Sequence, residues 1–158
     1  MNYKVNAYVE PHYPLKKTLL ISTATAALNA ANVKGKVELS ISIIGDRKMR
    51  KLNKEYKGVD APTDVLAFSY SLDSDQKEFS VPGAKYLNFG DVAISYPQLL
   101  DRAAKEEMLV DEMAMVLVIH GVLHLLGLDH EKGDEAEKME ALEDKILSTL
   151  RPAPEIIK

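Results

Sequence analysis

The sequence contains no cysteine, so it can form neither a disulfide bond nor a thiolate metal site. It has no long apolar run either: the longest, MAMVLVI at 113–119, is far shorter than the ~20 residues that span a bilayer. The first residues, MNYKVNAYVEPHYP, lack the apolar core of a signal peptide. Together these absences predict a cytoplasmic protein with no membrane partner, in keeping with the reducing compartment that a cysteine-free chain suits.

Charge is unevenly distributed along the 158 residues. Residues 1–60 carry eleven Lys and Arg against five Asp and Glu, whereas residues 61–158 carry nine against nineteen. This asymmetry is compatible with a surface that binds a polyanion. Two ordinary solvated surfaces would produce the same pattern, and charge alone favours that simpler interpretation.

Hydrophobic periodicity predicts the secondary structure. Strict alternation predicts a half-buried strand at 37–44, and strands are also expected at 64–70 and 85–95, with Gly90 a bulge or a point of close approach. Apolar residues at helical spacing predict five helices: 15–32, 46–58 with Asp46 as its cap, one from Pro97, 111–127 with Asp111 as its cap, and one from Asp134. The helix at 111–127 is apolar nearly all round and should be buried. Residues 1–150 should form one α+β domain, with a mobile loop at 71–84 and a flexible tail at 151–158.

Histidine is scarce, yet three of the four histidines lie in HGVLHLLGLDH at 120–130. His120 and His124 are one turn apart on one face of the predicted helix, a spacing that lets two imidazoles bind one ion. Gly127 can end the helix in the left-handed conformation and return the chain so that His130 becomes a third ligand. Three nitrogen ligands and an open fourth position are typical of a catalytic zinc site. The sequence therefore predicts one Zn²⁺ held by these three histidines.

Two features of this stretch leave alternatives open. Asp129 could accept the second N–H of a ligand imidazole, or it could merely cap the turn. The histidine spacing is also that of metzincin proteases, but those enzymes need a glutamate as general base directly after the first histidine. This chain has Gly121 there, which removes the main support for peptide hydrolysis.

The histidine stretch closely resembles the signature of the YbeY family, H-G-x-L-H-L-x-G-(Y/H)-D-H. This family comprises metal-dependent endoribonucleases that mature ribosomal RNA. The family's L-N-x-x-(Y/F)-R motif is matched by LNKEYK at 52–57, and its P-T-(D/N)-V-L-(S/T)-F motif by PTDVLAF at 62–68. GDV at 90–92 matches a short strand motif of the family. Three positions depart from the pattern, namely Lys57 for arginine, Ala67 for a hydroxyl residue and Leu128 for an aromatic residue or histidine.

The resemblance implies a mixed four-stranded sheet, a zincin-like metal-binding helix and a single metallohydrolase domain. It also implies a zinc-dependent, single-strand-specific endoribonuclease that matures the 3′ end of small-subunit ribosomal RNA and acts in ribosome quality control. The expected partners are single-stranded RNA, ribosomal RNA or the small subunit, and no DNA. By the same resemblance, Lys57 faces the zinc cleft and is a candidate ligand for the scissile phosphate.

The residues themselves leave the mechanism partly open. Either water or the substrate's 2′-hydroxyl could be the nucleophile, and no catalytic acid or base can be assigned. The basic segment from Arg47 to Lys57 could hold the phosphate backbone, or it could be a solvated face. Tyr56 could stack on a base, although its place in the apolar stripe favours the core. A metzincin-like protease and a non-catalytic zinc-containing ribosome-associated factor are the competing functions.

Overall fold

The computed structural model describes residues 2–70, 86–128 and 133–150, and its centre is a four-stranded sheet. The strands are β1 (Tyr3–Val9), β2 (Val37–Ile44), β3 (Val65–Ser69) and β4 (Leu87–Ser95). Their order across the sheet is β1-β2-β4-β3. β1 and β4 both pair with β2 in parallel, whereas β3 pairs with β4 in antiparallel, so the predicted mixed four-stranded sheet is confirmed.

Residue alternation decides which face of the sheet is buried. In β2, Val37, Leu39, Ile41 and Ile43 are buried and the intervening residues are half-buried, as the sequence predicts. β1 alternates in the same way but was not predicted from its residue pattern. It is an edge strand, and its outward residues are exposed.

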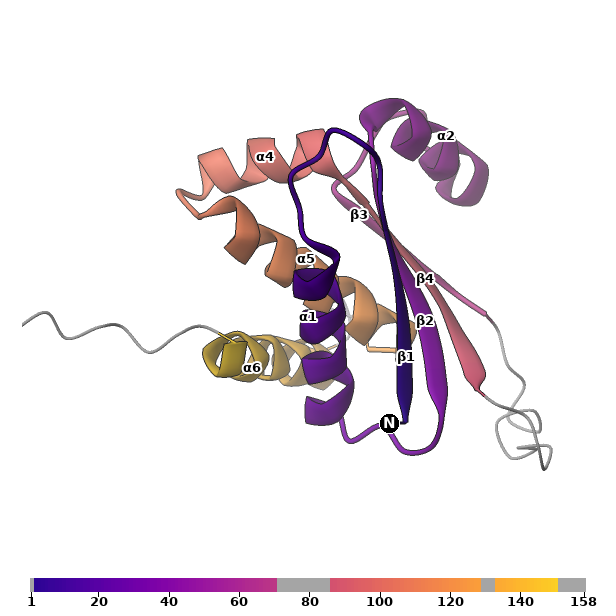
Figure 1. Cartoon of the computed structure of the whole chain (residues 1–158), viewed down its shortest axis with the longest axis vertical. Coiled ribbons are helices and arrows are strands. Elements are labelled where there is room, and N and C mark those ends of the chain that lie inside the picture. The colour runs from indigo at the N-terminus through magenta and orange to yellow at the C-terminus, as the bar shows by residue number, and fades with distance from the viewer. Residues whose placement is uncertain (1, 71–85, 129–132, 151–158) are drawn as a thin grey trace, which may run out of the picture.

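Five helices complete the described part of the chain: α1 (Lys17–Ala30), α2 (Asp46–Lys57), α4 (Tyr96–Lys105), α5 (Val110–Leu125) and α6 (Gly133–Leu150). Figure 1 shows α1, α4, α5 and α6 on one side of the sheet and α2 alone on the other. This arrangement is a single-domain α+β fold. The predicted loop at 71–84 and the predicted tail at 151–158 lie outside the described residues.

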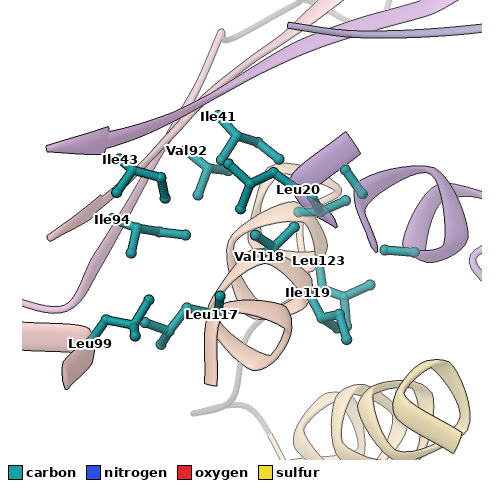
Figure 2. Packing of buried hydrophobic residues seen from close by; sticks show 14 of the residues in the cluster. Leu20, Ile41, Ile43, Val92, Ile94, Leu99, Leu117, Val118, Ile119 and Leu123 are labelled. Carbon is teal, nitrogen blue, oxygen red and sulfur yellow. The ribbon is translucent and has the colours of Figure 1, made fainter. Parts of the chain in front are cut away.

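The main core lies between the sheet and α5, which is buried as its apolar composition predicts. Figure 2 shows Ile41, Ile43, Val92 and Ile94 of the sheet facing side chains of α1 and α5. Leu117, Val118, Ile119, Val122 and Leu123 of α5 have no exposed surface. A smaller cluster under α2 contains Ile44, Met49, Leu66 and Ala93. Because α5 carries two of the predicted metal ligands, its packing fixes where they lie.

Two predicted helix caps are wrong. Gly45, not Asp46, is the N-cap of α2, and α5 begins after Leu109 with no side-chain cap, so Asp111 already lies inside the helix. The Asp46 carboxylate accepts hydrogen bonds from Ser95 Oγ at 2.7 Å and Gln98 Nε2 at 3.2 Å. It therefore joins α2 to the start of α4. Pro97 lies in the first turn of α4, as predicted.

Gly90 is a point of close approach, as the sequence predicts. Its φ is +130°, and a Cβ there would lie 2.0 Å from the carbonyl oxygen of Phe68. The β3 and β4 backbones could not pair as they do with any other residue at this position.

Within the described ranges, no single helix has the length and apolar character needed to cross a membrane. Among the helices of this described part, α4 and α5 taken together, across a bend of 113°, are the one pair that meets that test by length and composition.

Candidate metal centre

Two of the three predicted zinc ligands lie together near the end of α5. The ring centroids of His120 and His124 are 4.5 Å apart, with an angle of 54° between the rings. Both side chains are partly exposed, in contrast to the neighbouring apolar residues of α5. The i, i+4 spacing on a rigid, buried helix therefore places two imidazoles close enough to contact one ion.

A carboxylate on a different helix approaches the first of these histidines. The Oε1 atom of Glu143 in α6 lies 3.9 Å from Nδ1 of His120, and the two side chains are 20% and 31% exposed. An imidazole that binds a metal through one nitrogen commonly donates the N–H of the other to a carboxylate, which fixes its tautomer and orientation. At 3.9 Å the two atoms are too far apart for a hydrogen bond, but Glu143 is the carboxylate that stands beside His120 across the α5–α6 contact.

α5 ends in the turn that the sequence predicts. Gly127 has φ +90°, its N–H donates to the carbonyl of His124 at 2.9 Å, and Leu128 N–H donates to the carbonyl of Leu123 at 3.1 Å. This pair of hydrogen bonds is the Schellman motif, which reverses the chain just after the second histidine. His130 and Asp129 lie outside the described residues. Residues 2–70, 86–128 and 133–150 alone contain no group of three metal-ligating side chains.

The position after the first histidine has no room for a side chain. A Cβ on Gly121 would lie 2.5 Å from Cγ1 and 3.0 Å from Cγ2 of Val92 in β4. α5 therefore contacts the sheet through the bare backbone of this residue, and a glutamate here would require α5 to move. The general base of a metzincin protease cannot occupy this position in the present packing.

The two histidines share a cavity of about 120 Å³ with the end of α2. Its lining includes His120, His124, Lys57 and Ala67. Lys57 is the last residue of α2, and its exposed side chain is the only Lys or Arg among the described residues of this lining. A cation beside two imidazoles makes the cavity suitable for an anionic group.

The chain that follows Lys57 is held by specific contacts. The amide of buried Asn53 donates to the carbonyl of Ala61 at 2.8 Å. Arg50 forms two hydrogen bonds with Asp60, at 2.7 and 3.1 Å, and this contact lowers the pKa of the Asp60 carboxyl. These hydrogen bonds link residues of α2 before Lys57 to the chain that follows it, and so hold the turn between α2 and β3 in place.

Known proteins resemble this chain over most of its length. The family model described as "Endoribonuclease YbeY" matches residues 11–151. A protein of that name from Roseiflexus castenholzii is 41% identical over 150 residues, which covers 92% of each chain. This chain belongs to the YbeY family. Family members from Chloroflexus aggregans and Moorella thermoacetica are 37% and 39% identical and cover 95% and 86% of this chain, or 97% and 89% of their own.

The fold is also similar to that of a solved structure. The solution structure of a Thermotoga maritima protein, TM1509, matches with a TM-score of 0.60 at 19% identity. The match covers 98% of this chain and 99% of that one. At this identity the likeness concerns the fold alone, and it agrees with the α+β architecture described above.

Two residues of the YbeY family motifs have structural roles that sequence reasoning did not assign. Asn53 holds the turn after Lys57, as described above. Asp64 accepts hydrogen bonds from the backbone N–H of Val65 at 2.7 Å and from Arg102 of α4 at 2.8 Å. Partial burial opposes the charge of Arg102, but its hydrogen bonds to Glu106 and Asp64 outweigh this and raise its pKa. Asp64 therefore anchors the start of β3 to α4.

The departures from the family pattern fall in different environments. Ala67 lines the histidine cavity, so the missing hydroxyl group is a local change at the site. Leu128 packs against the main core, beside Leu126 and Leu142. An apolar side chain suits that position.

Glu143 was also missed by sequence reasoning. It is one of many acidic residues in the last helix, and its spacing from the histidines has no regular period. Only the packing of α6 against α5 shows that this acidic residue lies beside His120.

Proposed function

We propose that this protein is a zinc-dependent endoribonuclease that cleaves single-stranded RNA. Membership of the YbeY family supports the reaction class. The observation that carries the proposal is the small cavity in which His120, His124 and Lys57 meet. We further propose that its substrate in the cytoplasm is ribosomal RNA, through maturation of the 3′ end of the small-subunit RNA and quality control of ribosomes.

The residues present fit a zinc ion. His120 and His124 are partly exposed, lie one turn apart and line one cavity, and imidazole is a preferred zinc ligand. With His130 as the third ligand, the donor set would be three neutral nitrogens. Bound there, zinc would supply Lewis acidity toward a phosphoryl oxygen.

This chain's own residues supply the rest of the site. Glu143 would hold the Nδ1 proton of His120 and so keep the imidazole in one tautomer. Lys57 would bind the scissile phosphate as a point charge, which stabilises negative charge as it develops in the transition state. The basic residues of α2 would hold neighbouring phosphates without reading the sequence.

The competing functions are less well supported. A metzincin-like protease requires a base at position 121, where the contact with Val92 leaves no space. A non-catalytic ribosome-associated factor would use the same fold and would bind RNA without cleaving it.

Single-turnover cleavage of a labelled single-stranded ribosomal RNA fragment separates these functions. Wild-type protein of known zinc content should cleave it, and should cleave the same sequence far more slowly as a duplex. Cleavage should weaken as salt rises, because binding depends on phosphate contacts. The His124→Ala variant, purified identically, controls for a contaminating nuclease. Intact RNA in the presence of zinc-loaded wild type would favour the non-catalytic factor, and equal cleavage of both RNA forms would contradict single-strand specificity.

A further inference from the structure

The open face of the sheet has a groove that the cleavage site does not use. It lies beside α2 and has a volume of about 710 Å³, and the described residues of its lining include four aromatic side chains: Tyr8, Tyr56, Phe68 and Tyr70. The three tyrosines are 47%, 63% and 48% exposed. Sequence reasoning favoured a place in the core for Tyr56, and its exposure shows that this was wrong. Large apolar surfaces gathered in one groove indicate a binding site.

The shape of the groove suits flat rings. Tyr56 packs against Phe68 with ring centroids 4.7 Å apart and 51° between the rings, so Phe68 supports a ring that is otherwise exposed. The Tyr70 hydroxyl donates to Asp91 at 3.1 Å, which restrains that ring and raises the pKa of Tyr70. Ser40 and Ser42 of β2 form part of the lining between the aromatic side chains, and their small side chains leave space for a planar group.

The charge beside the groove favours a polyanion. One wall is α2, which carries six Lys and Arg against two acidic residues. Lys48 is in the lining, and Lys51 and Lys54 are exposed on the same helix. Lys48, whose side chain is 61% exposed, lies 3.6 Å from the half-buried Glu10, and water around the lysine screens this ion pair. Aromatic rings next to a row of cations are the combination with which proteins bind single-stranded nucleic acid.

Shared lining residues place the groove and the histidine cavity close to each other around the end of β3. Ser69 and Tyr70 line both the groove and a second cavity of about 510 Å³. His124 lines this second cavity and also the cavity that contains Lys57. An RNA strand with one phosphate bound at the histidines would reach the open face of the sheet by passing Tyr70.

We propose that this aromatic groove binds single-stranded RNA, with bases stacked on Tyr56 and Tyr8 and phosphates along α2. It would hold nucleotides that flank the cleaved bond, so it rests on the proposed function and extends the substrate site beyond the histidine cavity. Stacking requires unpaired bases, which gives the enzyme a physical reason to prefer single strands. A docked protein segment is the alternative occupant, and the basic wall argues for RNA.

Equilibrium binding of a single-stranded RNA of about 12 nucleotides tests the groove. The RNA carries 2-aminopurine, whose fluorescence falls when it stacks, and its integrity is checked after each measurement. Tyr56→Ala and Tyr8→Ala should each weaken binding by about 5- to 100-fold, as expected for the loss of one stacked base. Tyr56→Phe keeps the ring and should bind and quench like wild type. Leu109→Ala, which removes a 72% exposed side chain outside the groove lining, is the control.

Alanine variants that bind and quench like wild type would overturn the proposal. It would also be overturned if they kept RNA affinity but lost binding to a purified small-subunit ribosomal protein, because the groove would then be a protein interface. The salt dependence of binding should be the same in all variants, since no charge is changed. If the wild-type protein quenches 2-aminopurine fluorescence through Tyr56 but never cleaves RNA, the groove is confirmed as an RNA-binding site and the nuclease assignment is wrong. If the wild-type protein cleaves RNA and the tyrosine variants bind RNA as tightly as wild type, only the proposed role of the groove is wrong.

Discussion

Gly121 gives the most quantitative test of how α5 is positioned. A Cβ at this residue would lie 2.5 Å from Cγ1, 3.0 Å from Cγ2 and 3.3 Å from Cβ of Val92. Both γ-methyl groups belong to a fully buried side chain in β4, and the close packing of a protein interior opposes its rotation. Gly121→Ala must therefore push α5, and with it His120 and His124, away from the sheet.

The free energies can be estimated from these contacts. Overpacking a buried contact costs about 1–3 kcal/mol. Alanine in place of glycine inside a helix gains about 1 kcal/mol from helix propensity. The net change in the free energy of unfolding is therefore a loss of about 0–2 kcal/mol. In a Val92→Ala background the two clashing methyl groups are gone, so the same Gly121→Ala change should stabilise by about 1 kcal/mol.

Urea unfolding of the four proteins in this double-mutant cycle measures the effect. The coupling energy between positions 92 and 121 should be favourable by about 1–3 kcal/mol. Gly121→Ala should also weaken zinc binding in the Val92 background and less so in the Val92→Ala background. A coupling energy near zero, with Gly121→Ala more stable than wild type, would refute the close contact between α5 and β4.

Three further predictions concern the metal centre. Glu143→Gln should weaken zinc binding by about 10- to 100-fold in a chelator competition, because the imidazole of His120 loses its charged acceptor, whereas Glu140→Gln on the exposed side of α6 should not. Equal affinities for the two variants would remove Glu143 from the site. Lys57→Ala should keep its zinc and its fold but lose about 100-fold in the single-turnover rate of cleavage. Lys57→Arg should remain active, and Lys54→Ala should cleave at the wild-type rate at saturating protein. A fully active Lys57→Ala variant would show that Lys57 is a solvated lysine with no role in cleavage. Zinc affinity should fall as the solution is acidified from about pH 7.5 to about pH 5.5, because imidazole binds metal only when it is neutral and protons compete for it. A zinc affinity that does not depend on pH would argue against histidine ligands.

Much of the fold could be predicted from local patterns. The alternation of β2 and the all-round apolar surface of α5 gave correct elements, because each pattern reflects burial by a single neighbouring layer. The turn at Gly127 was also predictable, since left-handed backbone has a strong residue preference. The caps at Asp46 and Asp111 were wrong because helix starts depend on the preceding backbone, and Asp46 is used instead to bind α4.

The site was only partly predictable for a related reason. His120 and His124 are one turn apart on one helix, so their spacing alone brings them together. Glu143 meets His120 only through the packing of α6 on α5, which no local pattern reveals. Tyr56 was misjudged because its helical spacing matches Met49 and Leu52, although only those two pack under α2 and Tyr56 projects over the open groove. The His130 ligand and the role of Asp129 remain predictions.

Metal reconstitution tests the central claim most directly. The protein is stripped of metal with a chelator, zinc is added back in fractions of one equivalent, and the single-turnover rate of cleavage of one single-stranded RNA is followed. The stripped protein should be inactive, activity should return in proportion to zinc, and it should saturate at about one zinc per chain. The His120→Ala, His124→Ala and His130→Ala variants should not recover at that ratio. Full cleavage by stripped protein, or equal recovery by the three histidine variants, would contradict a zinc-dependent ribonuclease centred on these residues.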